Sequence, residues 1–597
     1  MSDSVPDKPC AAVLADQSAG ANPGRHAEVT VAEVGQATRS EGPVQQVLLS
    51  QDILPEIVAC LEEVSEATRW KDVIARLLVT NKAFFHAGIG SLWKSLDSLV
   101  PIFRLLPWFT TQSYTGVWLF KYSGADDWAR FNLYSPCIRR FSFPQTYEAT
   151  EWMKPPQIVE LLTLPERPTH LFPNLHHVSI WYIPDVVTPV PSLFFLVSPS
   201  LRTFEFLEVD SWRNSAATND AMPSDDLLTI LPRLYTSCSN IVSFSYSGPT
   251  NDTLILLLFQ LKSLKRIRLS STSRLDTFIL RCLHQLPLVE EIDIELPLLH
   301  ANAAEWATPT TPGSGLSTLR ALTVFTTPFG HGRTVCSLAP GPHLRELCLR
   351  FLTSPLIQLF KLCGLSYLEP NPNLEKLSFE FSGQHVHLSS DPGVLDTALE
   401  LLRGQEMFPV LMNNLKSIQQ FRFTDAPRDL AIAICPIVTR AMPFWKGVTC
   451  VTFRIDLSTG DPSTDVGRSP DPFPGLLFLV STVWKCCPKL QEFEYHFNWD
   501  LIAGENLTAP PTNSTQGQGP TTNSCHPLRR LWINTGAADI TRFTLSPSRK
   551  ADIAMFLDRL FPKLNDLGGS VGELWDDVRI LVKEFQMQRI RVGRTED

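Results

Sequence analysis

The chain has 597 residues, more than one compact core organises, so its length indicates several domains or one long repeat array. Charged residues make up only 19% of the chain, which indicates that most of it folds. The formal net charge is −9. This acidic balance lacks the basic footprint of nucleic-acid binders, so we expect no nucleic-acid partner.

The first 46 residues are polar and rich in Ala, Gly and Pro, and we expect a disordered tail over 1–46. They lack the apolar core of a secretory signal, and no apolar run reaches the roughly 20 residues that span a bilayer. The 13 cysteines are scattered and odd in number. We therefore expect a cytoplasmic or nuclear protein with reduced thiols and no membrane partner.

Apolar residues recur at helical spacing through the block 47–107. The pattern predicts three short helices, the first around Leu54, the second around Ile74 and the third ending near Trp93. So small a helical block buries little core alone. Its surplus apolar surface should be covered by a partner or by the part of the chain that follows.

The sequence of this block resembles an F-box. "LPEIVACL" (54–61), "LLVTNKAF" (77–84) and "SLWKSL" (91–96) match its three parts in order. The next stretch, "DSLVPIFRLLP" (97–107), resembles an extension common in F-box proteins of mushroom-forming, basidiomycete fungi. F-box proteins dock these helices on a Skp-type adaptor and so join a cullin–RING ubiquitin ligase, while the remaining domain holds the substrate.

The resemblance implies a set of adaptor contacts on the helical block: Leu54, Pro55, Ile57, Leu61, Phe84, Leu92 and Trp93. For Trp93 an equal alternative is a structural one, in which it joins the helices to the next domain together with the apolar residues that follow. Thr80 and Asn81 stand where the F-box usually has Val-Cys. A second hypothesis is therefore a non-ligase interaction scaffold with a degenerate F-box.

A six-residue phrase with apolar first, fourth and sixth places recurs thirteen times between 138 and 533. Fourth and sixth places are two residues apart, so on a strand both side chains face one side. The phrases are "IRRFSF" (138), "LHHVSI" (175), "LRTFEF" (201), "IVSFSY" (241), "LKRIRL" (264), "VEEIDI" (289), "LRALTV" (319), "LRELCL" (344), "LEKLSF" (374), "IQQFRF" (418), "VTCVTF" (448), "LQEFEY" (490) and "LRRLWI" (528).

Each phrase predicts a short strand, and the stretches between phrases have helical patterns and Pro turns. One such unit cannot cover its own apolar face, so we expect the units to stack with their strands in a parallel sheet. The phrase resembles the leucine-rich repeat, L-x-x-L-x-L, although the spacing is irregular. The predicted fold class is α/β: a three-helix F-box-like motif at 47–107, then an irregular leucine-rich-repeat solenoid at 108–544 with the sheet on its concave face.

Three insertions in the solenoid, at 306–318, 458–474 and 504–525, are rich in Pro, Gly, Ser, Thr and Asn, and we expect them to be disordered. The final segment, 545–597, has two helical patterns. The first bears Ile553, Phe556 and Leu557, and the second bears Leu574 and Val578. We expect these helices to cap the end of the solenoid, whose core would otherwise be exposed.

The third and fifth places of each phrase should face away from the core, where repeat proteins bind partners. The candidate substrate-binding residues there are Arg266, Arg268, Glu291, Asp293, Arg422, Glu494 and Trp532. An alternative for the charged residues, and the favoured one, is cross-strand salt bridges that only solvate the face.

Motifs for catalysis and for metal or cofactor binding are weak. "HVH" at 385–387 has no third ligand at metal spacing, and "FGHGR" at 329–333 lacks a strand-to-helix frame for phosphate. We therefore predict a non-enzymatic protein with no cofactor and no metal site. The predicted function is substrate recognition in a Skp–cullin–F-box ubiquitin ligase, with an unidentified protein as substrate. A third hypothesis, an enzyme hidden in the repeats, would need an organised cluster of titratable residues.

Overall fold

The computed structural model divides the chain into two compact units, Met1–Gly88 and Ile89–Asp597. The predicted tail at 1–46 and the bulk of the predicted insertions at 306–318, 458–474 and 504–525 lie outside the residues that it describes. The described residues are 53–64, 69–80, 82–111, 118–120, 128–142, 163–164, 167–182, 194–208, 225–271, 283, 286–295, 318–326, 343–351, 373–381, 416–456, 473–505, 507, 526–535, 545–570 and 572–595.

The first unit is helical, as its apolar spacing predicts. It contains α2 (Ile53–Val64), α3 (Arg69–Leu78) and most of α4 (Lys82–Trp93), which continues into the second unit. Each of α2 and α3 buries residues four apart on one side, because such residues lie on the same helix face. The buried side chains are Leu54 and Val58 from α2 and Ile74 and Leu78 from α3. Gly88 of α4 lies against Leu78 so closely that a Cβ there would be 2.8 Å from the leucine Cδ2.

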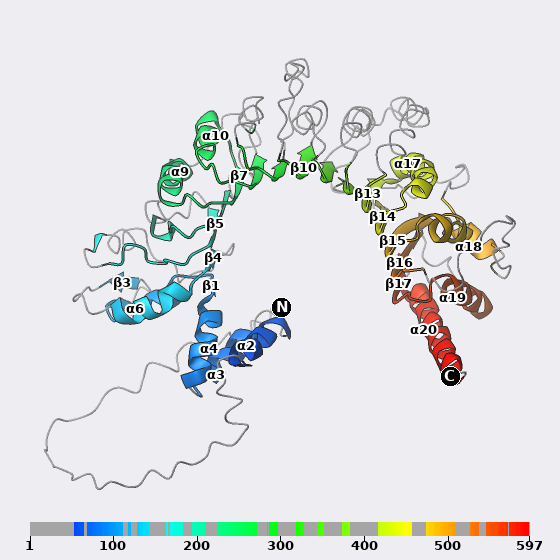
Figure 1. Ribbon diagram of the computed structural model, residues 1–597, viewed down its shortest axis with the longest axis horizontal. Coiled ribbons are helices and arrows are strands. Elements are labelled where there is room, and N and C mark those ends of the chain that lie inside the picture. The colour runs from blue at the N-terminus through cyan, green and yellow to red at the C-terminus, as the bar shows by residue number, and fades with distance from the viewer. Residues whose placement is uncertain are drawn as a thin grey trace, which may run out of the picture. The chain divides into compact units, whose positions relative to one another are not determined.

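The second unit is built on one open parallel sheet of fifteen strands (Figure 1). Its strands follow one another in chain order, with no strand inserted out of sequence. They are β1 (Ser95–Leu96), β4 (Arg140–Ser142), β5 (His177–Tyr182), β6 (Thr203–Glu208), β7 (Ser243–Gly248), β8 (Arg266–Ser271), β9 (Glu291–Glu295), β10 (Ala321–Thr326), β11 (Glu346–Phe351), β12 (Lys376–Phe381), β13 (Gln420–Pro427), β14 (Cys450–Asp456), β15 (Glu492–Phe497), β16 (Arg530–Thr535) and β17 (Asp566–Gly569).

All thirteen hexapeptides form strands of this sheet, β4 to β16, and the same place of each phrase pairs with the same place of the next. Leu322, for example, is a fourth place and pairs with the fourth places Ile292 and Leu347. First places such as Ile138 are fully buried where the chain enters its strand. The structure therefore confirms the predicted α/β class and the parallel, leucine-rich-repeat-like sheet of repeat strands.

Helices cover one face of the sheet, and the fourth and sixth places point into that covered side. Figure 1 shows α9 (Asp225–Ser237), α10 (Asp252–Leu258) and α17 (Arg428–Ala441) along this side. Shorter elements connect other strands. These are α5 (Val100–Phe103), α6 (Ala129–Tyr134), η2 (Ser135–Cys137), η6 (Met442–Phe444), the π-helix η8 (Leu479–Trp484), α18 (Trp499–Gly504) and the antiparallel hairpin β2–β3 (Phe109–Thr111, Trp118–Phe120).

Two end strands were not predicted. β1 pairs with β4 through Leu96 and Phe141, and β17 pairs with β16 through Leu567 and Leu531. After β1 the chain enters the core, where Leu99, Ile102 and Phe103 are buried. Beyond β16, α19 (Pro547–Leu560) and α20 (Gly572–Thr595) flank β17. The predicted apolar faces of these helices, from Ile553 to Leu560 and from Leu574 to Phe585, lie in or against the same core.

Candidate functional site

The face of the sheet opposite α9, α10 and α17, which we call the open face, is the candidate binding surface. Along β6, β7 and β12 each buried residue alternates with a partly exposed one. The exposed positions are the third and fifth places, because successive side chains on a strand point to opposite sides. Second places, just before each strand, line the same hollow: Glu290, Arg320 and Arg345 lie beside third and fifth places such as Arg266 and Asp293.

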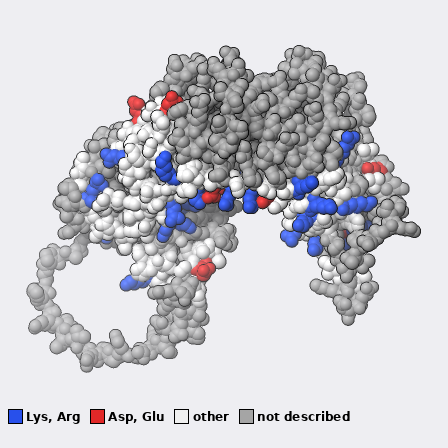
Figure 2. Space-filling view, turned by 45° about the horizontal axis from the view of Figure 1, so that its top comes forward, with Lys and Arg blue, Asp and Glu red and all other residues white. Residues whose placement is uncertain are grey.

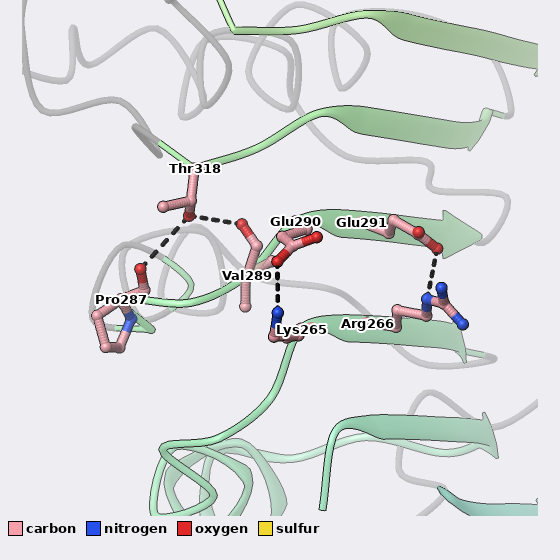
Figure 3. A network of polar contacts seen from close by, with 7 residues as sticks. All are labelled: Lys265, Arg266, Pro287, Val289, Glu290, Glu291 and Thr318. Carbon is pink, nitrogen blue, oxygen red and sulfur yellow. Dashed lines mark hydrogen bonds and ion pairs between the residues drawn. The ribbon is translucent and has the colours of Figure 1, made fainter.

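The predicted charged residues of β8 and β9 meet as cross-strand ion pairs. Arg266 Nε lies 3.0 Å from Glu291 Oε2, and Arg268 Nε lies 3.3 Å from Asp293 Oδ2. The in-register pairing of the two strands places these residues opposite each other. Figure 3 shows a third pair alongside, Lys265 with Glu290 at 2.7 Å.

In the same network Thr318 donates from Oγ1 to the carbonyl oxygen of Val289 at 2.7 Å and, at 3.4 Å, to that of Pro287 (Figure 3). These hydrogen bonds link the turn before β10 to the turn before β9. Exposed ion pairs contribute little to stability. These contacts are the cross-strand ion pairs of the favoured alternative, and they bring opposite charges together on this part of the open face.

Burial governs the acidity of Asp293. It raises the pKa of this carboxyl above its usual range, although the guanidinium groups of Arg268 and Arg350 oppose the shift. Arg350 in turn holds Glu380 on the neighbouring strand at 2.6 Å. The middle of the open face is thus a set of linked charges of both signs rather than a surface of one sign.

Arg422 and Glu494 line a second polar hollow on the open face, between β12 and β16. Glu494 accepts a hydrogen bond from Asn534 Nδ2 at 3.1 Å and lies 3.8 Å from Arg454 Nε. Arg454 also lies 3.4 Å from Asp425, which has a left-handed φ of 59° at an irregularity in β13. The hollow therefore brings together two of the predicted residues, both with polar neighbours.

Trp532 is the exposed aromatic residue that the sequence singled out, and 36% of it is accessible. It stands opposite Glu494 on one side and Gly568 on the other. A Cβ on Gly568 would lie 2.4 Å from the Trp532 ring. The ring therefore rests against the backbone of β17, which holds a flat apolar surface in place at the end of the open face.

The predicted adaptor contacts differ in their burial. Pro55 is exposed, and Ile57, Leu61 and Phe84 are half-buried, so their side chains are accessible in the first unit. Leu54 is only 1% exposed because it points inward from α2. Its contribution to any interface would be through the packing of the helices.

Leu92 and Trp93 lie in the second unit and are half-buried. The Trp93 ring packs on Tyr134, with ring centroids 5.0 Å apart, and against the core of that unit. These contacts match the structural alternative for Trp93, in which it joins the helices to the domain that follows.

The second places of the hexapeptides were not predicted as part of the open face. Their backbones form a hydrogen-bonded row in which the amide of each second-place residue donates to the carbonyl of the preceding one. Several of these residues are exposed arginines: Arg139, Arg202, Arg320, Arg345 and Arg529. Figure 2 shows Lys and Arg side chains gathered in groups on the described part of one side of the second unit. The signal was present, since five of the thirteen phrases have arginine at their second place.

Within the described ranges, no group of three His, Cys, Asp or Glu residues is placed to hold a metal ion. No helix in that part of the chain combines the length and apolar character needed to cross a membrane. "HVH" at 385–387 and "FGHGR" at 329–333 fall outside it, as does Asn81.

No family model and no curated protein matches the chain. Solved structures similar to it include a protein from Bacteroides fragilis, 9% identical with a TM-score of 0.22, which covers 63% of this chain and 66% of that one. Another is the TLR13–ssRNA13 complex, which is 12% identical with a TM-score of 0.26. The match covers 68% of this chain and 58% of that one. The chain thus spans less than two thirds of the length of either. At these TM-scores neither likeness supports a statement about function, and the fold is defined by the sheet itself.

Proposed function

We propose that the chain is a non-enzymatic adaptor that joins a protein substrate to a Skp–cullin–RING ubiquitin ligase. The main observation that supports this proposal is that apolar side chains are exposed on the first unit. Ile53 is 37% exposed, Val73 42% and Val79 71%. A partner that covered these side chains would remove their apolar area from water, which favours association. In this proposal the partner is a Skp-type adaptor, as the resemblance of these helices to an F-box implies.

The unusual Thr80 is compatible with such an interface. Its hydroxyl donates to the carbonyl oxygen of Leu77 at 2.7 Å. A buried hydroxyl is costly mainly when it has no hydrogen-bond partner. Covering Thr80 with an adaptor would therefore bury a group whose hydrogen bond is already made, which favours a working interface over a degenerate one.

The second part of the proposal, that the solenoid binds a protein substrate, is based on the open face. It extends over the whole series of strands, has polar hollows of mixed charge and ends at the exposed ring of Trp532. Aromatic and arginine side chains are those that most often dominate binding energy in protein interfaces. In this proposal the chain positions a substrate and carries out no chemistry, and it needs no cofactor.

The test is calorimetric titration of the full chain with a purified Skp-type adaptor, using wild type and Ile57→Asp. Ile57 is half-buried on α2, so the variant should fold, while an aspartate in the contact would have to be desolvated. We expect micromolar or tighter binding by wild type and at least a 30-fold loss in the variant. Ala59→Asp, at an exposed position of the same helix, is the matched control and should bind within a factor of about three of wild type.

Absence of binding by the wild-type chain at 50 micromolar adaptor, a concentration about 50-fold above a micromolar dissociation constant, would rule out the ligase function and leave an interaction scaffold with a degenerate F-box. Equal losses in both variants would mean that the adaptor does not contact α2 through Ile57.

A further inference from the structure

The helix that follows β17, α20, has one buried and one exposed apolar side. The buried side recurs at every fourth residue and lies in the core of the second unit: Leu574, Val578 and Val582. The exposed side carries three large apolar residues, each more than half accessible: Ile580, Met587 and Ile590. Seven residues are close to two helical turns, so Ile580 and Met587 lie one above the other, about 20° apart around the axis. We call this side of α20, from 576 to 591, the exposed stripe.

Charged residues divide the exposed stripe along its length. Asp576 lies at its start and Arg591 at its end, and both are exposed. Lys583 and Glu584, also exposed, stand at its midpoint on either flank of the apolar residues. Asp576 pairs with Arg579 of the same helix, with Oδ1 and Nη2 2.7 Å apart. Because exposed ion pairs contribute little to stability, this carboxylate can exchange its partner for another cation at small cost.

The order of these residues is complementary to itself when the direction of the helix is reversed. In an antiparallel pair whose two-fold axis passes between Lys583 and Glu584, these two residues face each other across the interface. The same axis is equally far along the helix from Ile580 and Met587. Each isoleucine therefore stands opposite a methionine of the other copy, and the apolar parts of the two stripes cover each other.

The charges at the two ends follow the same symmetry. The axis is equally far from Asp576 and Arg591, so each end of the pair brings the aspartate of one copy to the arginine of the other. A parallel pair would instead place aspartate against aspartate and arginine against arginine, and like charges repel. The charge pattern thus selects the antiparallel arrangement.

We propose that the exposed stripe is an interface between two copies of this chain, paired antiparallel about a two-fold axis. A two-fold interface uses the same patch on both copies, so the patch must be complementary to itself, as this one is. Figure 1 shows α20 at the end of the strand series, with its C-terminal part extending past β17. A membrane surface is the less favoured occupant, because helices that lie on membranes carry mainly Lys and Arg on their polar side, whereas the start of α20 is acidic at Glu573, Asp576 and Asp577.

Sedimentation equilibrium of the full chain from about 2 to 200 micromolar tests the proposal, since interfaces below about 1,200 Å² are typically weak. We expect a monomer–dimer equilibrium with a dissociation constant on the order of 10 micromolar. Met587→Asp would bury a charge in the apolar part of the pair and should weaken association about tenfold or more. Leu256→Asp, at a similarly exposed apolar position of α10, is the matched control and should stay within about threefold of wild type.

Exchange of the end charges tests the orientation. Arg591→Asp leaves two aspartates facing each other at each end and should weaken association about fivefold or more at low salt. Adding Asp576→Arg to the same chain restores opposite charges only in an antiparallel pair, so the double variant should return to within about threefold of wild type.

A wild-type chain that stays monomeric over the whole range would overturn the proposal. So would dimers that Met587→Asp does not weaken, or an equal loss in Leu256→Asp, because association would then not depend on the exposed stripe. A double variant that stays as weak as Arg591→Asp would overturn the antiparallel arrangement.

Discussion

At the scale of single residues, the end of the sheet depends on two glycines. Gly568 leaves room for the Trp532 ring, and Gly569 has even less space. A Cβ on Gly569 would lie 2.1 Å from the backbone oxygen of Ile533 and 2.5 Å from the Trp575 ring. A backbone oxygen in a paired strand cannot move aside as a flexible side chain can, so any larger residue at this position strains the end of the sheet.

We therefore predict that Gly569→Ala lowers the free energy of unfolding by about 1–3 kcal/mol, the usual cost of overpacking. Gly572→Ala is the control, since a Cβ there meets nothing within 4 Å. At the start of α20 it should be neutral or slightly stabilising. Urea unfolding followed by tryptophan fluorescence measures both, and equal effects of the two substitutions would contradict the steric explanation.

His526 makes stability depend on pH. Its Nδ1 accepts from the Leu528 amide at 3.2 Å, while Nε2 lies 3.0 Å from the carbonyl oxygen of Cys487, so the fold uses the neutral ring with its proton on Nε2. Burial lowers the pKa of His526 below 6.5, against hydrogen bonds to carbonyl oxygens that would raise it. The unfolded chain thus binds a proton more readily than the folded one.

It follows that the stabilisation from this site is present above pH 6.5 and is lost as the pH falls through that value toward the lower pKa of the folded state. Thermal melts should show a fall in wild-type melting temperature between pH 7 and pH 5 that is smaller in His526→Gln. The exposed His343 gives the control, since His343→Gln should retain the wild-type profile. An unchanged profile in His526→Gln would show that this ring does not titrate with unfolding.

At the scale of elements, sixth-place aromatic residues stack from strand to strand. Phe453 on β14 lies with its ring centroid 5.0 Å from that of Phe423 on β13 and 5.0 Å from that of Tyr495 on β15. The planes are close to parallel, at 13° and 29°. Because adjacent strands pair in register, the ring of each repeat supports the rings of its neighbours.

Phe453→Ala should therefore cost about 3–5 kcal/mol of unfolding free energy, the range for deleting a buried phenylalanine. Phe444→Ala, which removes a ring that is 46% exposed, should cost less than about 1 kcal/mol. Denaturant titration compares the two, and a similar cost for both would mean that the stacked rings do not hold neighbouring repeats together.

The sequence predicts the strands well because one physical requirement recurs in each repeat. The first, fourth and sixth places must all be apolar where a strand is covered on one face, and thirteen strands satisfy this. β1 and β17 escape prediction because their sixth places are Ser98 and Gly569. At the sixth place of β17 the Trp575 ring occupies the space that an apolar side chain would fill. The first and fourth places of β1 and β17, Trp93 and Leu96 or Leu564 and Leu567, are still apolar.

The candidate sites were only partly predictable. Period-two alternation places Arg268 and Asp293 on the open face, and the register makes them partners. The exposed arginines Arg139 and Arg202 were missed because they stand at second places, which belong to no strand and whose neighbours are set by backbone hydrogen bonds between repeats. In the first unit, helical spacing predicts that Leu54 and Ile57 lie on one side, but packing buries the first and leaves the second accessible.

At the scale of the whole molecule, the proposed function assigns a different task to each of the two units. The helical unit exposes apolar side chains such as Val73 and Val79. The solenoid presents a polar open face in which each strand contacts only its neighbours, so a substitution in the first unit should leave the strands intact. If the proposed function is right, adaptor binding and substrate binding are separable.

The most direct test is affinity capture of the full chain from cells treated with a proteasome inhibitor, comparing wild type with Ile57→Asp by quantitative mass spectrometry. We expect wild type to co-purify a Skp-type adaptor, a cullin and a set of further proteins. The variant should lose the adaptor and the cullin and retain the others. Capture of no adaptor by wild type, or loss of all partners together in the variant, would contradict the claim.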